Sequence, residues 1–137
     1  MTVNKQDIFG ILGLSGAGKS TLLKTIMGIV DPLFGNVKYG FNVKVGYFDQ
    51  QVATKVSEDT ILQDYMKTYP FLTNQEARND LGCFLFSGKD VDKKVNVLSG
   101  GEIVRLSLAK IFKTSPNLLI LDEPTNHMDI VSKETIE

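Results

Sequence analysis

The sequence has little of several features that mark common protein classes. Its one cysteine, Cys83, excludes a disulfide within the chain and fits a reducing compartment. The 15 basic and 16 acidic side chains nearly cancel, so the chain lacks the strong positive charge of many nucleic-acid-binding domains. Apolar runs are far shorter than the ~20 residues of a membrane-spanning helix, and Met1–Asp7 is too polar for a signal peptide. These absences predict a cytoplasmic globular domain that does not insert into membranes.

What the sequence does have is a glycine-rich loop near its start. The segment Gly13–Ser20 (GLSGAGKS) fits the pattern G-x-x-x-x-G-K-[ST], whose backbone N–H groups cradle phosphates. We expect Lys19 to bind the β- and γ-phosphates of a nucleotide, Ser20 to bind Mg²⁺ and Thr21 to donate to the α-phosphate side. The predicted nucleotide-binding residues of this loop are Gly13, Leu14, Ser15, Gly16, Ala17, Gly18, Lys19, Ser20 and Thr21.

The glycines of this loop have a predicted structural role. A side chain at Gly13, Gly16 or Gly18 would obstruct the approach of the phosphates or forbid the turn. The plain alternative is a glycine-rich turn where a strand joins a helix. Because an apolar strand is predicted before the loop and a helix after it, the phosphate-binding interpretation is favoured.

A second candidate site follows an apolar run late in the chain. The segment Leu118–Pro124 (LLILDEP) reads as a buried strand that ends in two carboxylates. We expect Asp122 to hold Mg²⁺, directly or through water, and Glu123 to act as the general base for the attacking water. The alternative is a strand that merely ends in solvated acids, which the glycine loop earlier in the chain disfavours.

Two single residues are further candidates. Gln50 follows the predicted strand Val43–Phe48, where its amide could reach Mg²⁺ and the nucleophilic water, and Gln51 is the alternative if the register is off by one. His127 is the only histidine, and a structural or interface role is favoured for it over proton transfer.

The segment Leu98–Glu102 (LSGGE) has two interpretations that are compatible. Ser99 and Glu102 have the spacing of a capping box for the following helix. Capping does not require two glycines, however, and Gly100 and Gly101 leave the helix N-terminus bare, which suits a γ-phosphate. We therefore predict that Ser99, Gly100 and Gly101 bind a nucleotide held by a second domain facing this one.

Hydrophobic periodicity and turn signals predict an α/β core with a helical insert. The core is expected at residues 1–50 and 116–137, and the helical subdomain at 51–115, ending in the helix after LSGGE. Predicted strands are Ile8–Leu12, Leu118–Leu121 and a hairpin of Asn36–Tyr39 with Val43–Phe48. Helices are predicted over Lys19–Met27 and about Gly101–Phe112. Three more are predicted to start at a cap: one capped by Ser57, one with a Thr73–Glu76 capping box and one that begins at Ser132. The segment Ser87–Asp90 is expected to be loop.

In this order and spacing, GLSGAGKST, Gln50, LSGGE and LLILDEP resemble an ATP-binding-cassette (ABC) ATPase domain. The segment Glu123–Asp129 (EPTNHMD) is similar to the EPTNHLD of the F subfamily, which are soluble ABC proteins that act on ribosomes. The segment Leu81–Val91 (LGCFLFSGKDV) is similar to the C-terminal cassette of that subfamily. The resemblance, which covers about Phe9–Glu137, implies a P-loop NTPase fold with an ABC-type RecA-like core and a helical subdomain.

The resemblance also implies a function. ATP and Mg²⁺ are the expected cofactors, and Glu123, Lys19 and Gln50 the catalytic residues of ATP hydrolysis. Ser20, Asp122 and Gln50 are the expected metal ligands. A second cassette in head-to-tail arrangement is the implied partner, and the ribosome a further candidate, in translation or antibiotic protection.

Several departures and alternatives stay open at this stage. Ser15, Ile103 and Met128 differ from the usual residues of the subfamily. Met1–Asp7 offers no aromatic side chain to stack on adenine, and His127 comes too early to be the switch histidine, so we expect an incomplete cassette. The ATPase subunit of a membrane transporter is the first alternative. An SMC-like or DNA-repair ATPase is disfavoured, because no long coiled coil fits between the two ATP motifs. The third alternative is a nucleotide-binding module that does not hydrolyse ATP.

Overall fold

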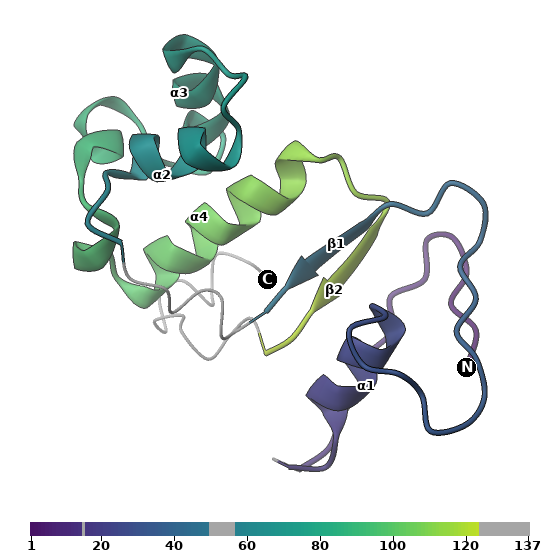
Figure 1. Ribbon diagram of the computed structural model, residues 1–137. Coiled ribbons are helices and arrows are strands. Elements are labelled where there is room, and N and C mark those ends of the chain that lie inside the picture. The colour runs from purple at the N-terminus through teal and green to yellow at the C-terminus, as the bar shows by residue number, and fades with distance from the viewer. Residues whose placement is uncertain (15, 50–56, 124–137) are drawn as a thin grey trace. The chain divides into compact units, whose positions relative to one another are not determined.

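The computed structural model describes residues 1–14, 16–49 and 57–123 (Figure 1). The chain divides into two units. The first unit is Met1–Gly40 and the second is Phe41–Glu137. Within the described ranges, no helix is long and apolar enough to cross a membrane.

The first unit contains one helix, α1 (Lys19–Ile26), as the sequence predicts. The helix ends where the sequence places its stop: Gly28 has a φ of 73°, a left-handed conformation that glycine adopts without strain. The predicted buried strand over residues 8–12 is wrong. These residues form no strand, and Ile8 and Leu12 are 102% and 97% exposed. A strand needs a neighbour to complete its hydrogen bonds, and the described part of this unit contains no other strand.

The second unit contains a two-stranded parallel sheet of β1 (Val45–Phe48) and β2 (Leu118–Leu121). The register runs from the pair Val45 and Leu118 to the pair Phe48 and Leu121. The predicted hairpin is therefore wrong, because the partner of β1 comes from far along the chain and residues 36–39 form no strand. The prediction that β2 is fully buried is also wrong, since only Ile120 among its residues is buried.

Helix α4 (Gly100–Lys113) packs against β1 across a single glycine. A Cβ atom on Gly46 would lie 2.6 Å from Cγ2 of Ile111 and 2.9 Å from Cγ of Pro116, which is closer than real contacts allow. Beside this close approach, Phe48 and Val104 form a small buried cluster between strand and helix. The absence of a side chain at Gly46 is thus what lets α4 and its following turn lie against the sheet.

The helical segment has its own core. It comprises α2 (Ile61–Thr68), α3 (Asn74–Gly82), the 3₁₀ helices η2 (Gly88–Asp92) and η3 (Val95–Val97), and α4. Apart from Val104, which packs with Phe48, its buried hydrophobic residues form one cluster: Ile61, Leu62, Tyr65, Leu72, Ala77, Leu81, Phe86, Val91, Val95, Leu106 and Ala109. The prediction that residues 87–90 are loop is wrong: Ser87 is the N-cap of η2 and residues 88–90 are its first three residues, and η2 carries Val91 into this core.

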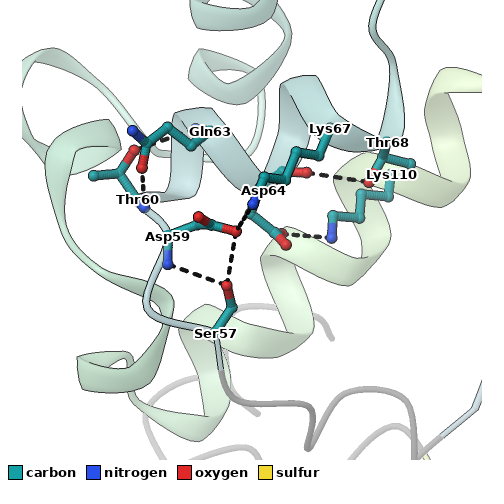
Figure 2. A network of polar contacts seen from close by, with 8 residues as sticks. All are labelled: Ser57, Asp59, Thr60, Gln63, Asp64, Lys67, Thr68 and Lys110. Atoms are coloured by element: carbon teal, nitrogen blue, oxygen red, sulfur yellow. Dashed lines mark hydrogen bonds and ion pairs between the residues drawn. The ribbon is translucent and has the colours of Figure 1, made fainter.

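Each α-helix of this segment begins with a capping box. The pairs are Thr60 with Gln63, Thr73 with Glu76 and Ser99 with Glu102. The last two confirm the sequence prediction. The prediction that Ser57 caps α2 is wrong: its hydroxyl accepts from the backbone N–H of Asp59 and donates to the carboxylate of Asp59 instead (Figure 2).

Ion pairs join the outer surfaces of these helices. Asp64 of α2 lies 2.5 Å from Lys110 of α4 (Figure 2), and Asp80 of α3 lies 2.7 Å from Lys113 of α4. The Tyr65 hydroxyl donates to Asp80. Burial, followed by the nearby charge of Asp80, raises the pKa of Tyr65. Partly exposed pairs of this kind contribute about 0–1 kcal/mol each, so the apolar core remains the main source of stability.

Candidate functional site

The glycine loop of the first unit has the backbone conformation that a phosphate-binding loop needs. Gly16 and Gly18 have φ values of 81° and 93°, in the left-handed region where residues with a Cβ are strained. A Cβ at either position would meet no heavy atom within 4 Å, so conformation rather than space requires glycine there. The backbone N–H of Ala17 donates to the carbonyl of Leu14, which closes the turn before α1 begins.

Gly13 differs from the other two glycines. A Cβ there would lie 3.4 Å from Cβ of Ala17, which is an ordinary contact, and its φ is outside the left-handed region. The prediction that a side chain at Gly13 would forbid the turn is therefore not supported. Its predicted role in leaving room for a ligand remains a prediction.

Lys19 folds back over the loop. Its ammonium donates to the carbonyl oxygens of Gly13, at 2.7 Å, and Leu14, at 2.9 Å. These are two carbonyls of the loop itself, so the positive charge is held inside the curve of the backbone. From this position the ammonium can exchange its bonds to the two carbonyls for bonds to an incoming phosphate, without a change in the backbone.

The N-terminus of α1 has no side-chain cap. Gly18 occupies the cap position and offers no side-chain oxygen to the first turn, in contrast to the three capped helices of the second unit. Ser20 is half-buried in this turn and Thr21 is exposed. The backbone N–H groups at this end, together with the helix dipole, are therefore available to an anion.

Asp122 is a buried carboxylate at the carboxyl end of the sheet. It is 6% exposed and is the one buried charged residue among those that the structure describes. Its backbone N–H donates to the carbonyl of Phe48 at 3.0 Å, which extends the ladder of β1 and β2 by one bond. A buried charge is costly unless it is paired or binds a cation, so this carboxylate fits a hard divalent ion such as Mg²⁺.

Glu123 follows at a turn. It has a φ of 48°, an uncommon conformation for a residue with a side chain, and it is exposed. Conformations of this kind cluster at functional sites, where they turn the chain sharply after a strand. Exposure leaves the carboxylate accessible to water, which agrees with the predicted role of a general base.

Among the described residues, no cluster of metal-ligating side chains accompanies these carboxylates. Within residues 1–14, 16–49 and 57–123, no three His, Cys, Asp or Glu side chains gather as a cation site. Mg²⁺ that arrives with a nucleotide needs only one or two protein carboxylates, because phosphates and water complete its coordination.

The LSGGE segment forms the start of α4. The Ser99 hydroxyl accepts from the N–H of Glu102, and the carboxylate of Glu102 accepts from the N–H of Ser99 and lies 3.7 Å from the ammonium of Lys93. The N–H of Ile103 donates to the carbonyl of Ser99. The N–H groups of Gly100 and Gly101 take no part in this capping box; Gly100 is half-buried and Gly101 is buried.

Several predicted site residues lie outside the described residues. These are Ser15, Gln50, Gln51 and His127. Residues 124–137, including most of EPTNHMD and the helix predicted from Ser132, lie outside them as well. Lys19 and Ser20 belong to the first unit, and Asp122, Glu123 and Ser99–Gly101 belong to the second.

Comparison with known proteins places these motifs in a family. Residues 1–126 match the family model described as ABC transporter. The ATP-binding protein YdiF of Bacillus subtilis (strain 168) is 51% identical over 127 residues, which are 93% of this chain and 20% of YdiF. The ABC transporter F family member 5 of Arabidopsis thaliana is 41% identical over 139 residues, which are 100% of this chain and 20% of that protein. The chain therefore spans about a fifth of the length of these curated relatives.

A solved structure shows the same fold. It is an inward-facing conformation of a metal-chelate type ABC transporter, and it superposes with a TM-score of 0.78 over 98% of this chain and 56% of the transporter chain. The two sequences are 24% identical, so this likeness concerns the fold alone. It confirms the predicted class, a mixed α/β P-loop fold.

Proposed function

We propose, from the premise that this chain belongs to the ABC ATPase family, that it binds ATP with Mg²⁺ and contributes one cassette to an ATP-hydrolysing protein of the F type. The observation that carries the proposal is the glycine loop, in which Lys19 is held inside the backbone curve ahead of an uncapped helix N-terminus. In this function, the loop residues bind the polyphosphate, Lys19 neutralises its charge and Ser20 supplies a hydroxyl to Mg²⁺.

The second unit supplies the remaining chemistry of hydrolysis. Asp122 is the carboxylate that would hold Mg²⁺, an ion that would supply positive charge to the phosphates when bound. Glu123 accepts the proton of the attacking water, and Gln50 helps to orient that water. Lys19, Gln50 and Glu123 are thus the proposed catalytic residues.

The geometry at the start of α4 supports the proposal that a second cassette is the partner. Ser99 is exposed, and the N–H groups of Gly100 and Gly101 make no bond in their own capping box. A γ-phosphate presented by a second cassette in head-to-tail arrangement would give these donors an acceptor. The partner can be a second cassette of the same protein or of another chain.

The relatives supply the biological context of the proposal. One of them is named as a member of the ABC transporter F family, and the EPTNHMD segment is similar to that of the F subfamily. We therefore propose a cytoplasmic protein that acts on the ribosome, in translation or antibiotic protection. The ATPase subunit of a membrane transporter has no comparable support from the residues of this chain.

The test compares two lysines of α1. Lys19→Ala removes the ammonium held in the loop, whereas Lys24→Ala removes an equal charge from the last turn of the same helix. In the full-length protein, titration with a fluorescent ATP analogue in Mg²⁺ should show that Lys19→Ala weakens binding by about 1.5–3 kcal/mol, the usual cost of a lost charged hydrogen bond.

Lys24→Ala should leave this affinity unchanged. Equal affinities for the wild-type protein and the Lys19→Ala variant would contradict the proposed function. Equal weakening by both substitutions would show that only net charge attracts the nucleotide.

A further inference from the structure

Tyr47 has a buried hydroxyl without a hydrogen-bond partner. Among the described residues, its Oη is the one buried side-chain oxygen or nitrogen that lacks a partner. The sequence indicates an ordinary packing aromatic at this position, and a phenylalanine would serve that purpose. A buried hydroxyl without a partner destabilises the fold, because it has lost its hydrogen bonds to water. Its presence therefore indicates a role other than packing.

The register of the sheet places Tyr47 beside the proposed metal ligand. Tyr47 pairs with Ile120 in the parallel ladder, and paired residues project from the same face of a sheet. Asp49 and Asp122 each lie two positions further along their strands, and therefore on that same face. Gly46 and Phe48 project from the opposite face, which α4 covers.

The charges around Tyr47 agree with this placement. Burial raises the pKa of the Tyr47 hydroxyl above its ordinary value, and the carboxylates of Asp49 and then Asp122 raise it further. The shared face of the sheet thus places this unpartnered hydroxyl near two carboxylates. Asp122 is the more buried of these two acids. A hydrogen-bond donor therefore stabilises its carboxylate more, because hydrogen bonds are stronger where water is excluded.

We propose that Tyr47 is a positioning residue for the metal site: its hydroxyl, which has no partner in the fold without ligand, donates a hydrogen bond through one water to the Asp122 carboxylate when the site is occupied, and so fixes the oxygen that faces Mg²⁺. This inference rests on the proposed function. A carboxylate has lone pairs for both a metal and a donor, and groups that orient metal ligands in this way typically change metal affinity about 10–100-fold when removed.

The test is Tyr47→Phe, which removes the hydroxyl and keeps the ring. In the full-length protein, the affinity for a fluorescent ATP analogue in EDTA should stay at the wild-type value. The Mg²⁺ concentration that gives half of the metal-dependent increase in affinity should rise about 10-fold or more. The melting temperature without ligand should be unchanged or slightly higher, because no hydrogen bond of the fold is lost.

Tyr69→Phe is the matched control. The Tyr69 hydroxyl donates to the backbone carbonyl of Lys110, within the helical segment. Its removal should lower the melting temperature and leave the Mg²⁺ dependence unchanged. The two variants are thus expected to have opposite effects: Tyr47→Phe changes metal dependence but not stability, and Tyr69→Phe changes stability but not metal dependence.

Each other result overturns the inference. An unchanged Mg²⁺ dependence for Tyr47→Phe, with or without a loss of stability, would show that Tyr47 only packs. Equal weakening of binding in Mg²⁺ and in EDTA would place the hydroxyl at the nucleotide instead of the metal ligand. If the wild-type protein itself failed to bind the analogue, the proposed function would fail first, and the inference with it.

Discussion

The helical segment of the second unit and the first unit differ in what holds their residues in place. In the helical segment, side chains such as Ile61, Tyr65 and Leu81 are almost fully buried in one cluster, and three capping boxes begin the α-helices. In the first unit, no described residue is buried, and Leu33 and Phe34 are 100% and 92% exposed. The glycine loop is shaped by positive φ angles and by the internal bonds of Lys19.

The difference shows two ways in which a sequence can specify structure. A packed segment satisfies its polar groups internally and gains stability from burial. A ligand-binding loop keeps N–H groups and a lysine ammonium for another molecule, so it contributes little to its own stability. The two regions should therefore respond differently to the same substitution.

The largest expected contrast is between two leucines. Leu81→Ala removes a fully buried side chain of α3, whereas Leu12→Ala removes one that is exposed. For the 137-residue chain, Leu81→Ala should cost about 2–5 kcal/mol of unfolding free energy, as buried leucines do. Leu12→Ala should stay within about 0.5 kcal/mol of the wild type, as surface changes do. Urea unfolding measures both.

A large loss of unfolding free energy for Leu12→Ala would contradict this comparison. It would show that residues 8–12 are buried as a strand in solution, as the apolar pattern of the sequence predicts. An unchanged stability for Leu81→Ala would instead show that the helical segment lacks the core described here.

A smaller contrast concerns two glycines of the second unit. Gly46→Ala places a Cβ within 2.6 Å of Ile111, so we expect a loss of about 1–3 kcal/mol, as in other overpacked cores. Gly82→Ala, at the end of α3, meets nothing within 4 Å. It should be neutral or stabilise the chain by up to about 1 kcal/mol, because alanine favours helix. Thermal unfolding of the two variants provides the measurement, and equal melting temperatures would contradict the tight contact between α4 and β1.

Local signals in the sequence predicted the local structure well. The spacing of Thr73 and Glu76, and of Ser99 and Glu102, identified two helix starts, because a capping box involves residues only three positions apart. Ala77 and Leu81 lie on one face of α3 because of their helical spacing, and both are buried. The cap of α2 was misplaced by three positions, since Ser57 and Thr60 have equivalent side chains and only the fold distinguishes them.

Long-range features could not be predicted in the same way. The apolar run of β1 fits a hairpin strand as well as a parallel one, and its partner β2 lies far along the chain. The role of Gly46 depends on Ile111 and Pro116, which no local pattern connects to it. For the candidate site, the motif identified the loop and its lysine, but the unpartnered hydroxyl of Tyr47 depends on the sheet register and has no sequence signal.

The central claim is that the glycine loop of the first unit and the carboxylates of the second serve one nucleotide. A double-mutant cycle of Lys19→Ala and Asp122→Asn tests it most directly, with Mg²⁺·ATP affinity of the full-length protein as the readout. We predict that the two losses are not additive and differ from their sum by at least about 0.5 kcal/mol, because both groups act on the same bound phosphates. Losses that add to within about 0.3 kcal/mol would show that the two groups act at independent sites and would contradict the claim.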